Sequence, residues 1–283
     1  MGASGNIGKA IMRSGLANNF IPASTNPAKR LDNYLRLNPF RISDLNQFLV
    51  ENACDGIVLL TGCSKLAYCE QEPHISYSVN VELPCQIARL ASDHDLPVVF
   101  FSTEYLYNGS FNFPKTESDK NLLKLSNYSK QKHAMEELVM SLNPCSTILR
   151  IPKIYNHFYP GNLLGDLLEV FKTNKRLLVA KDQVLSPLSS EDLSNILTQV
   201  IKKKLFGIFN CGGPEHMSRF RFAQIVSSFV SNDVELEPVK LSDVVDCSLI
   251  PLNTCMDSSR LSQLLKYSSC SINDYMIKFN FGD

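Results

Sequence analysis

The residues with the clearest chemical potential in this sequence are Tyr128 and Lys132, within the segment Ser-Asn-Tyr-Ser-Lys-Gln-Lys-His at 126–133. On a helix, side chains four residues apart lie on one face, about one turn from each other. A lysine ammonium held there favours the phenolate of the tyrosine, whose free pKa of about 10 is too high for proton transfer near neutral pH. The spacing therefore predicts an acid/base pair. The plainer alternative is a solvated helix face.

A second candidate site is the glycine-rich N-terminal segment, which is followed by a helical pattern starting near Asn6. Glycines let the backbone approach a pyrophosphate, whose charge would lie at the positive end of that helix. A flexible terminus of small residues is the alternative. The strand expected before such a loop is missing from the sequence, so either the start is truncated or misassigned, or the fold tolerates a gap. The candidate cofactor loop consists of Gly2, Ser4, Gly5, Asn6, Ile7 and Gly8.

Strand-sized apolar runs alternate with helical patterns through the first half of the chain. Continuous apolar strands are typical of a parallel sheet covered on both faces, so this alternation predicts an α/β fold. Ligands of such sheets bind at the carboxyl edge, where the run 96–101 would deliver Ser102, Thr103 and Glu104. The expected strands are 19–23, 34–40 (an edge), 56–60 and 96–101, and the expected helices are 43–52, with Ser43 as N-cap, and 76–92.

The segment after the expected second strand bears on the choice of cofactor. In a dinucleotide-binding fold, an acidic residue about 20 positions after the glycines binds the ribose 2′-hydroxyl and repels a 2′-phosphate. Here the sequence offers Thr25, Lys29 and Arg30 instead. These residues favour NADP(H), although NAD(H) is possible and the two cations would equally suit a solvated loop.

An ordered series of motifs resembles the extended branch of the short-chain dehydrogenase/reductase superfamily, most closely the dTDP-4-dehydrorhamnose reductase-like sugar-nucleotide group. The series spans nearly the whole chain, and its joint order is far more specific than any single piece. Glu104 stands where the family usually has aspartate, and Ser129 where it has glycine. Besides the glycines and Tyr128-x-x-x-Lys132, the matching pieces are Thr61-Gly62, Val79-Asn80-Val81, Ser-Thr-Glu-Tyr-Leu-Tyr-Asn-Gly at 102–109, Leu-Arg-Ile-Pro-Lys-Ile-Tyr at 149–155, and Gly-Ile-Phe-Asn-Cys-Gly-Gly at 207–213.

The resemblance implies a role for each matching residue. Thr103, Tyr128 and Lys132 would be the catalytic set: the tyrosine donates a proton to the substrate carbonyl oxygen, the lysine lowers the tyrosine pKa and holds the nicotinamide ribose, and the threonine hydrogen-bonds the same oxygen. For Thr103 the alternative is a strand-end hydroxyl that caps backbone groups. Thr61 and Gly62 would line the cofactor, and Ser102, Thr103, Glu104 and Tyr105 would contact the substrate.

We expect a Rossmann-like doubly wound parallel sheet with a smaller C-terminal substrate lobe. The cofactor domain would cover 1–157, with 186–213 returning to it, and the lobe would comprise 158–185 and 214–283. The second half contains expected helices at 162–173, 191–203 and 218–230, and a strand at 177–180. Ser189 or Ser190 is the expected N-cap of the helix at 191–203.

The composition of the chain limits the classes of partner that we expect it to bind. Hydrophobic residues make up 44% of the 283 residues, charged residues 20%, and the formal net charge is zero. This balance argues against nucleic-acid and membrane partners. The nine cysteines include no C-x-x-C pair, and the histidines show no metal spacing, so neither a metal site nor a disulfide framework is indicated. A cytoplasmic setting is the simplest expectation, with a homodimer or a partner enzyme possible.

The resemblance implies NADP(H)-dependent reduction of a nucleotide-linked 4-keto sugar. One alternative is a non-catalytic, cofactor-binding regulatory subunit, similar to that of methionine adenosyltransferase. Another is a sugar-nucleotide epimerase or dehydratase, because those enzymes share the Tyr/Lys pair. Fold similarity alone does not separate these functions.

Overall fold

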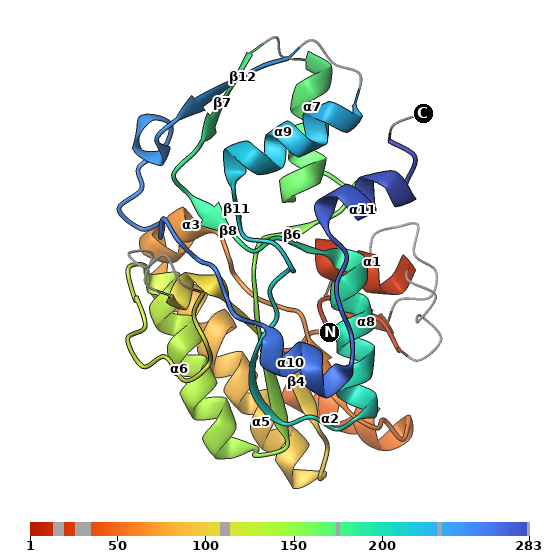
Figure 1. The fold of residues 1–283 in the computed structure, drawn as a ribbon. Helices are drawn as coiled ribbons and strands as arrows, with labels where there is room; N and C mark the ends of the chain where they lie inside the picture. Colours follow the sequence, from red (N-terminus) through yellow and green to blue (C-terminus); the bar gives the residue numbers. More distant parts are fainter. Residues whose placement is uncertain (14–19, 26–34, 108–113, 174–175, 231–233, 282–283) are drawn as a thin grey trace.

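A four-stranded parallel sheet forms the centre of the larger lobe (Figure 1). The computed structural model describes residues 1–13, 20–25, 35–107, 114–173, 176–230 and 234–281, so Lys29 and Arg30 lie outside the described residues. The predicted α/β fold with a parallel sheet is confirmed. In spatial order the strands are β10 (Gly207–Asn210), β5 (Ser146–Ile151), β4 (Val98–Thr103) and β3 (Ile57–Leu59), and a separate parallel pair consists of β1 (Ala23–Ser24) and β2 (Leu35–Arg36).

The N-terminal residues connect the sheet to the β1–β2 pair. The described part of the chain contains no strand before α1 (Asn6–Arg13). Instead, Met1 N donates to Val58 O at 2.6 Å and Leu60 N donates to Met1 O at 2.9 Å. On the other side, Ala3 N donates to Ala23 O at 3.1 Å. Residues 1–3 therefore lie between β3 and β1, at the position of the first strand in a doubly wound sheet.

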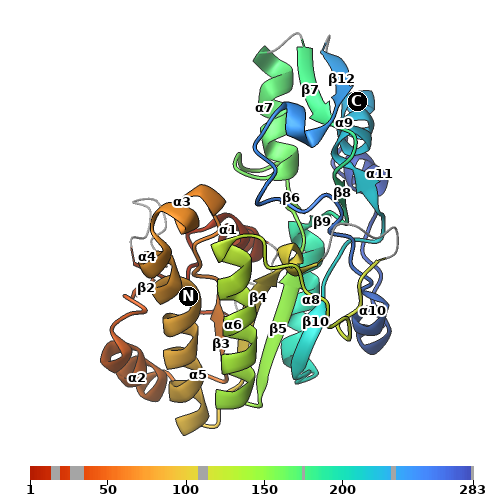
Figure 2. The same ribbon diagram turned by 90° about the vertical axis from the view of Figure 1, so that its left-hand side faces the viewer.

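Helices cover both faces of the sheet (Figures 1 and 2). One apolar cluster joins the strands to α2 (Ile42–Glu51), α5 (Leu83–Asp93) and α6 (Asn127–Leu142). A second cluster joins the opposite face to α1, α8 (Ser190–Lys202) and α10 (Ser259–Leu265). All six residues of β4 are buried, which explains the continuous apolar sequence at 98–101.

Two helix predictions need correction. Ser43 lies inside α2 rather than capping it: Arg41 is the N-cap residue and makes no side-chain cap, and Ser43 Oγ donates to Asp44 Oδ1 instead. The expected helix at 76–92 is composite, because α4 (Pro73–Tyr77) continues through a π-helical turn (Ser78–Glu82) into α5. The N-cap of α8 is Ser189, whose hydroxyl accepts a hydrogen bond from Asp192 N.

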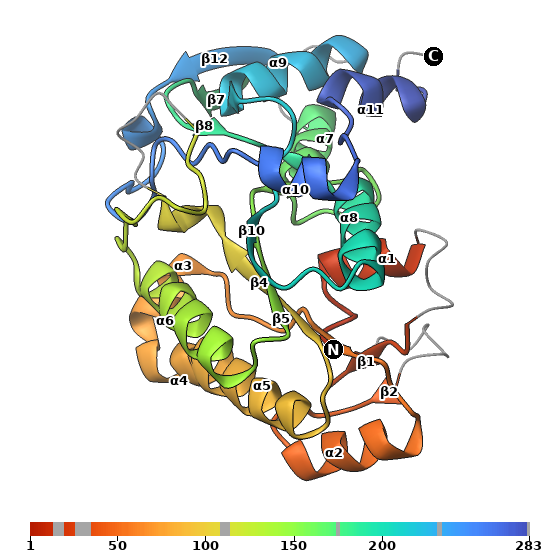
Figure 3. The ribbon, with the colours of Figure 1, turned by 60° about the horizontal axis from the view of Figure 1, so that its bottom comes forward.

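A smaller lobe has its own apolar cluster, built around Tyr155, Phe222 and Tyr275. Figure 3 shows this lobe beside the sheet. Its β7–β12 pair is parallel, and the second strand of that pair has no counterpart among the expected elements. The elements of the lobe are β6 (Ile154–Tyr155), α7 (Leu163–Thr173), β7 (Arg176–Ala180), β8 (Val184–Leu185), β11 (Met217–Ser218), α9 (Arg219–Phe229), β12 (Glu235–Val239) and α11 (Ile272–Lys278).

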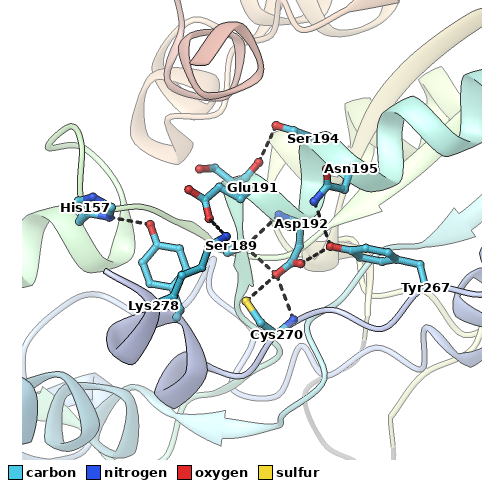
Figure 4. A network of polar contacts seen from close by, with 11 residues as sticks. His157, Ser189, Glu191, Asp192, Ser194, Asn195, Tyr267, Cys270 and Lys278 are labelled. Atoms are coloured by element: carbon cyan, nitrogen blue, oxygen red, sulfur yellow. Dashed lines mark hydrogen bonds and ion pairs between the residues drawn. The ribbon is translucent and has the colours of Figure 1, made fainter. Parts of the chain in front are cut away.

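The C-terminal segment is held to both lobes. The expected lobe range 214–283 includes α10, but Leu261 and Leu265 of this helix pack in the second cluster, against the sheet. Figure 4 shows the contacts of the segment that follows α10. Asp192 of α8 accepts hydrogen bonds from Tyr267 OH at 2.5 Å and from Cys270 N at 3.3 Å. The carboxylate thus secures the link between α10 and α11.

Candidate active site

A cleft of about 900 Å³ lies between the carboxyl edge of the sheet and the smaller lobe. It brings together residues from the glycine loop, from the ends of β3 and β4, and from α6. Among the described residues that line it are thirteen of the predicted ones: Gly2, Gly5, Asn6, Ile7, Gly8, Thr61, Gly62, Ser102, Thr103, Glu104, Tyr105, Tyr128 and Lys132. Two further predicted residues, Ser4 and Thr25, do not line this cleft.

Tyr128 and Lys132 face the cleft because α6 is fixed at its start. Ser126 is the N-cap residue, and its side chain and that of Ser129 form a reciprocal capping box. The serine that replaces the family glycine therefore stabilises the helix start. Glu70, on α3 (Leu66–Gln71), accepts hydrogen bonds from Asn127 N at 2.6 Å and from Asn127 Nδ2 at 2.9 Å. This double contact secures the first turn of α6.

Thr103 ends β4 beside Tyr128. Its hydroxyl is hydrogen-bonded to the Tyr128 side chain and accepts a hydrogen bond from Tyr105 N at 3.2 Å. The bond from Tyr105 N is the backbone cap that the sequence analysis gave as the alternative role of Thr103. Tyr105 packs edge-to-face against Tyr128, with 6.5 Å between ring centroids.

The pKa values of Tyr128 and Lys132 differ from those expected of an acid/base pair. Burial of the Tyr128 hydroxyl raises its pKa, and the Thr103 hydrogen bond only partly offsets this effect. Burial likewise lowers the pKa of Lys132 to about 8. Lys132 Nζ donates to Phe101 O at 2.9 Å. In the protein alone, therefore, Lys132 does not bring the pKa of Tyr128 down, because desolvation of the hydroxyl dominates.

The glycine loop has the shape that a dinucleotide requires. Gly2 has a φ of +81°, and a Cβ at this position would meet Thr61 N at 2.7 Å. A Cβ at Gly8 would meet Ala3 O at 2.4 Å, whereas at Gly5 the nearest atom is Gly2 O at 3.4 Å. Two glycines thus permit the fold of the loop, and Gly5 leaves an open surface at the start of α1. This cradle fits the pyrophosphate of NAD(P)(H).

Ser4 and Thr25 lie at the β1 side of the loop. Ser4 Oγ is 2.7 Å from the hydroxyl of Ser24, the last residue of β1, and the exposed Thr25 follows. Ser24 completes this group of hydroxyls and was not among the predicted site residues. These hydroxyls lie where the adenosine ribose binds in this type of sheet.

Another part of the cleft centres on Glu104. This buried carboxyl lies near Lys153 and Arg219, and its side chain is hydrogen-bonded to Thr254. Burial raises the pKa of Glu104 to about 7 despite both cations. Within the described chain, Glu104 Oε2 and Ser102 Oγ have no hydrogen-bond partner. Unpartnered buried polar atoms at a cleft are suited to a polar ligand.

Several cleft residues come from segments that sequence reasoning did not connect. Lys153 follows β5, Gln183 precedes β8, and Arg219 begins α9. Nε of Arg219 is hydrogen-bonded to Oε1 of Gln183. The lobe side is mostly aliphatic: Leu163, Leu167, Val170, Leu177, Leu178, Val179, Leu241, Val244, Val245 and Ile250. Local patterns mark the aliphatic residues only as parts of their helices, strands and turns.

Asn80 is a further buried residue that orders the cleft. Its side chain accepts from Cys63 N at 2.8 Å and donates to Cys63 O and Gln131 Oε1, both at 2.9 Å. It therefore joins the loop after β3 to α6. The Val79-Asn80-Val81 motif was the only signal in the sequence for this residue.

Two structural findings concern metal ions and membranes. Among the described residues, no group of three or more His, Cys, Asp or Glu side chains is arranged to hold a metal ion. None of the helices that the structure describes is both long and apolar enough to cross a membrane.

Known proteins provide an independent comparison. A model of the RmlD substrate binding domain family matches residues 1–276. A dTDP-4-dehydrorhamnose reductase of Sinorhizobium fredii (strain NBRC 101917 / NGR234) is 30% identical over 199 residues, which span 68% of this chain and 66% of that protein, just under two thirds. Methionine adenosyltransferase 2 subunit beta of Bos taurus is 24% identical over 275 residues, covering 93% of this chain and 80% of that protein.

A solved structure supports the fold. The dTDP-4-dehydrorhamnose reductase of Bacillus anthracis in complex with NADP has a TM-score of 0.83 at 21% identity, covering 98% of this chain and 96% of that chain. The chain belongs to the RmlD substrate-binding domain family, in the dTDP-4-dehydrorhamnose reductase-like group of the extended short-chain dehydrogenase/reductase superfamily.

Proposed function

We propose that the chain is an NADP(H)-dependent reductase of a nucleotide-linked 4-keto sugar. The observation that carries this proposal is the convergence of Thr103, Tyr128 and Lys132 on one cleft with the glycine loop. The S. fredii relative named as a dTDP-4-dehydrorhamnose reductase supports it. NADP(H) is preferred over NAD(H) because no acidic residue follows β1 at 24–30, where Thr25, Lys29 and Arg30 occur.

Each residue has a distinct task in the proposed reaction. The loop 2–8 would hold the pyrophosphate, and Lys132 would hold the nicotinamide ribose. When bound, the cofactor supplies the hydride for the carbonyl carbon. Tyr128 donates its proton to the carbonyl oxygen, and Thr103 donates a hydrogen bond to the same oxygen. Because the pKa of Tyr128 is raised, the neutral phenol that a reduction requires is its resting form.

Glu104 would orient the sugar rather than transfer the reacting proton. Its unpartnered Oε2 can bond a sugar hydroxyl, and the nearby Lys153 and Arg219 are suited to the diphosphate of a nucleotide sugar. The aliphatic lobe side would cover the less polar parts of the substrate.

The test is NADPH consumption by the purified protein with dTDP-linked 4-keto-sugars, with the product identified by chromatography. Tyr128→Phe should lower turnover by about 100-fold or more while leaving the NADPH Kd within about twofold. Tyr68→Phe, at an exposed tyrosine, is the matched control. Equal turnover in Tyr128→Phe would exclude this tyrosine as the acid. Inversion of configuration at a sugar carbon without net NADPH consumption would favour an epimerase.

A regulatory subunit is a second candidate function. The alignment with methionine adenosyltransferase 2 subunit beta spans 93% of this chain, more than the alignment with the S. fredii reductase. NADPH binding without keto-sugar turnover, together with co-purification of a methionine adenosyltransferase, would favour this candidate.

A further inference from the structure

Two cysteines lie in contact beside the cleft. Cys63 lies in the loop after β3 and lines the cleft, while Cys69 lies on α3 and is fully buried. Their sulfur atoms are 3.8 Å apart, and the Cys69 thiol donates toward Cys63 Sγ. It also lies 3.5 Å from Cys63 O. The sulfurs need to approach by only about 1.8 Å to reach the length of a disulfide bond, about 2.05 Å.

The surroundings of Cys63 and Cys69 favour a reaction between the two thiols. Two hydrogen bonds between the Asn80 side chain and the Cys63 backbone, one accepted and one donated by Asn80, position the Cys63 side chain beside Cys69. Cys63 has access to solvent through the cleft, whereas Cys69 does not. A half-buried thiol that reaches the cleft, next to a fully buried thiol, is the arrangement of an attacking and a resolving cysteine.

We propose that Cys63 and Cys69 are a reversible modification site, which a low-molecular-weight disulfide such as oxidised glutathione converts to an intramolecular disulfide. The proposed reductase activity does not require this chemistry, and neither thiol has a part in that mechanism.

The reaction takes place in two exchange steps. The Cys63 thiol loses its proton to solvent and attacks one sulfur of the oxidised glutathione; the glutathione S–S bond breaks, and one glutathione leaves as a thiolate. Cys69 then loses its proton and attacks Cys63 Sγ, which releases the second glutathione. Two protein thiols are oxidised and one glutathione disulfide is reduced. Burial raises the pKa of Cys69 to about 11, so the second step should quicken as the pH rises.

The disulfide would also change the cleft. A Cβ built at Gly62 lies 3.7 Å from Lys132 Nζ and 3.7 Å from Asn80 Oδ1, so the loop packs closely on the proposed nicotinamide site. Drawing Cys63 toward α3 moves this loop. We expect oxidation to weaken NADPH binding by about threefold or more, a consequence that rests on the proposed function.

Peptide mapping tests the modification directly. The purified chain is reduced, freed of reductant, incubated with oxidised glutathione, alkylated and digested with trypsin. Trypsin cleaves after Lys65, between the two cysteines, so only a disulfide keeps the peptides 42–65 and 66–89 together. We expect the linked pair, two hydrogens lighter than the separate peptides, and its loss with dithiothreitol. These peptides also contain Cys54 and Cys85, so Cys54→Ser/Cys85→Ser is the matched control and should retain the link.

Single variants test the order of the steps. Cys69→Ser should retain one glutathionyl group on Cys63, and Cys63→Ser should leave Cys69 unmodified. Alanine variants replace any serine variant that loses its native circular dichroism. Separate, fully alkylated peptides from the wild-type chain, or an unmodified Cys63 in Cys69→Ser, would overturn the proposal. If the reduced chain binds no NADPH, the proposed function fails, and the peptide map still decides whether the disulfide forms.

Discussion

Arg150 on β5 holds Glu136 on α6 by two hydrogen bonds, from Nε to Oε1 at 2.9 Å and from Nη2 to Oε2 at 2.6 Å. Both side chains are buried. Arg150 Nη1 also donates to Tyr107 OH at 2.8 Å, and that hydroxyl is 2.5 Å from Asn210 Oδ1 on β10. Glu136 lies one turn after Lys132, so this network ties the helix of the proposed catalytic residues to two strands.

Removing the arginine should destabilise the protein strongly. Arg150→Met leaves the Glu136 carboxylate buried without its partner, which typically costs about 3–5 kcal/mol. Urea unfolding measures this loss. Lys172→Met is the matched control, because Lys172 pairs with Glu169 on the exposed face of α7 and such pairs contribute about 1 kcal/mol or less. Equal losses in the two variants would mean that the buried pair does not secure α6.

Two glycines of the candidate cofactor loop should respond differently to alanine. In Gly8→Ala the new Cβ meets the Ala3 backbone, so both the unfolding free energy and NADPH affinity should fall. In Gly5→Ala the nearest atom is 3.4 Å away, so the unfolding free energy should change by about 1 kcal/mol or less.

The NADPH affinity of Gly5→Ala should nevertheless fall on the order of tenfold, because the methyl group occupies the surface that the pyrophosphate approaches. Fluorescence titration with NADPH, alongside urea unfolding, separates the two effects. Unchanged NADPH affinity in a stable Gly5→Ala would argue against the loop as the pyrophosphate site.

Local sequence signals predicted the elements that carry the site. The continuous apolar run of β4 located Thr103 at a strand end, and the spacing of Tyr128 and Lys132 located both on one helix face. These features depend on neighbouring residues, through alternation, helical period and turn chemistry. The order of the motifs then indicated that they share a sheet edge.

Features that depend on distant contacts were not predictable in this way. Lys153 and Arg219 approach Glu104 only because three separate segments pack together. The raised pKa of Tyr128 follows from the burial of its hydroxyl. This burial cannot be deduced from the four-residue spacing of Tyr128 and Lys132. Met1 forms hydrogen bonds to β3 and to the residue after it, and Ala3 forms one to β1. Residues 1–3 are too few to show a strand pattern in the sequence, yet these bonds place them between the two strands.

Lys132→Met should abolish turnover without destabilising the protein at pH 7. Burial lowers the pKa of Lys132 from 10.5 to about 8, so below pH 8 the folded state bears the full cost of a buried ammonium. At 1.36 kcal/mol per pKa unit this cost is about 3 kcal/mol, whereas the lost bond to Phe101 O is worth about 1 kcal/mol.

The sign of the pH dependence follows from proton binding. Between pH 8 and pH 10.5 the unfolded chain binds more protons at Lys132, so wild-type stability rises with pH relative to the variant. Urea unfolding of both proteins at pH 7 and pH 9.5 measures the difference. A constant difference between the two pH values would contradict the lowered pKa of Lys132.

Glu104→Gln should stabilise the protein at pH 8 but not at pH 4. Burial raises the pKa of Glu104 from 4.5 to about 7, so between these values the folded state binds more protons than the unfolded chain. Wild-type stability therefore falls from pH 4.5 to pH 7, and the full penalty of about 3 kcal/mol is present above pH 7. Glutamine keeps the shape of the side chain and removes this titration.

Urea unfolding across pH 4–8 compares wild type, Glu104→Gln and the control Glu72→Gln, at an exposed site. The control should follow the wild-type curve, while Glu104→Gln should diverge from it above pH 4.5. Parallel curves for all three proteins would mean that Lys153 and Arg219 keep Glu104 ionised. The carboxylate would then only accept hydrogen bonds from a sugar, whereas the protonated acid can also donate one, so this measurement decides which hydroxyl geometry the cleft can recognise.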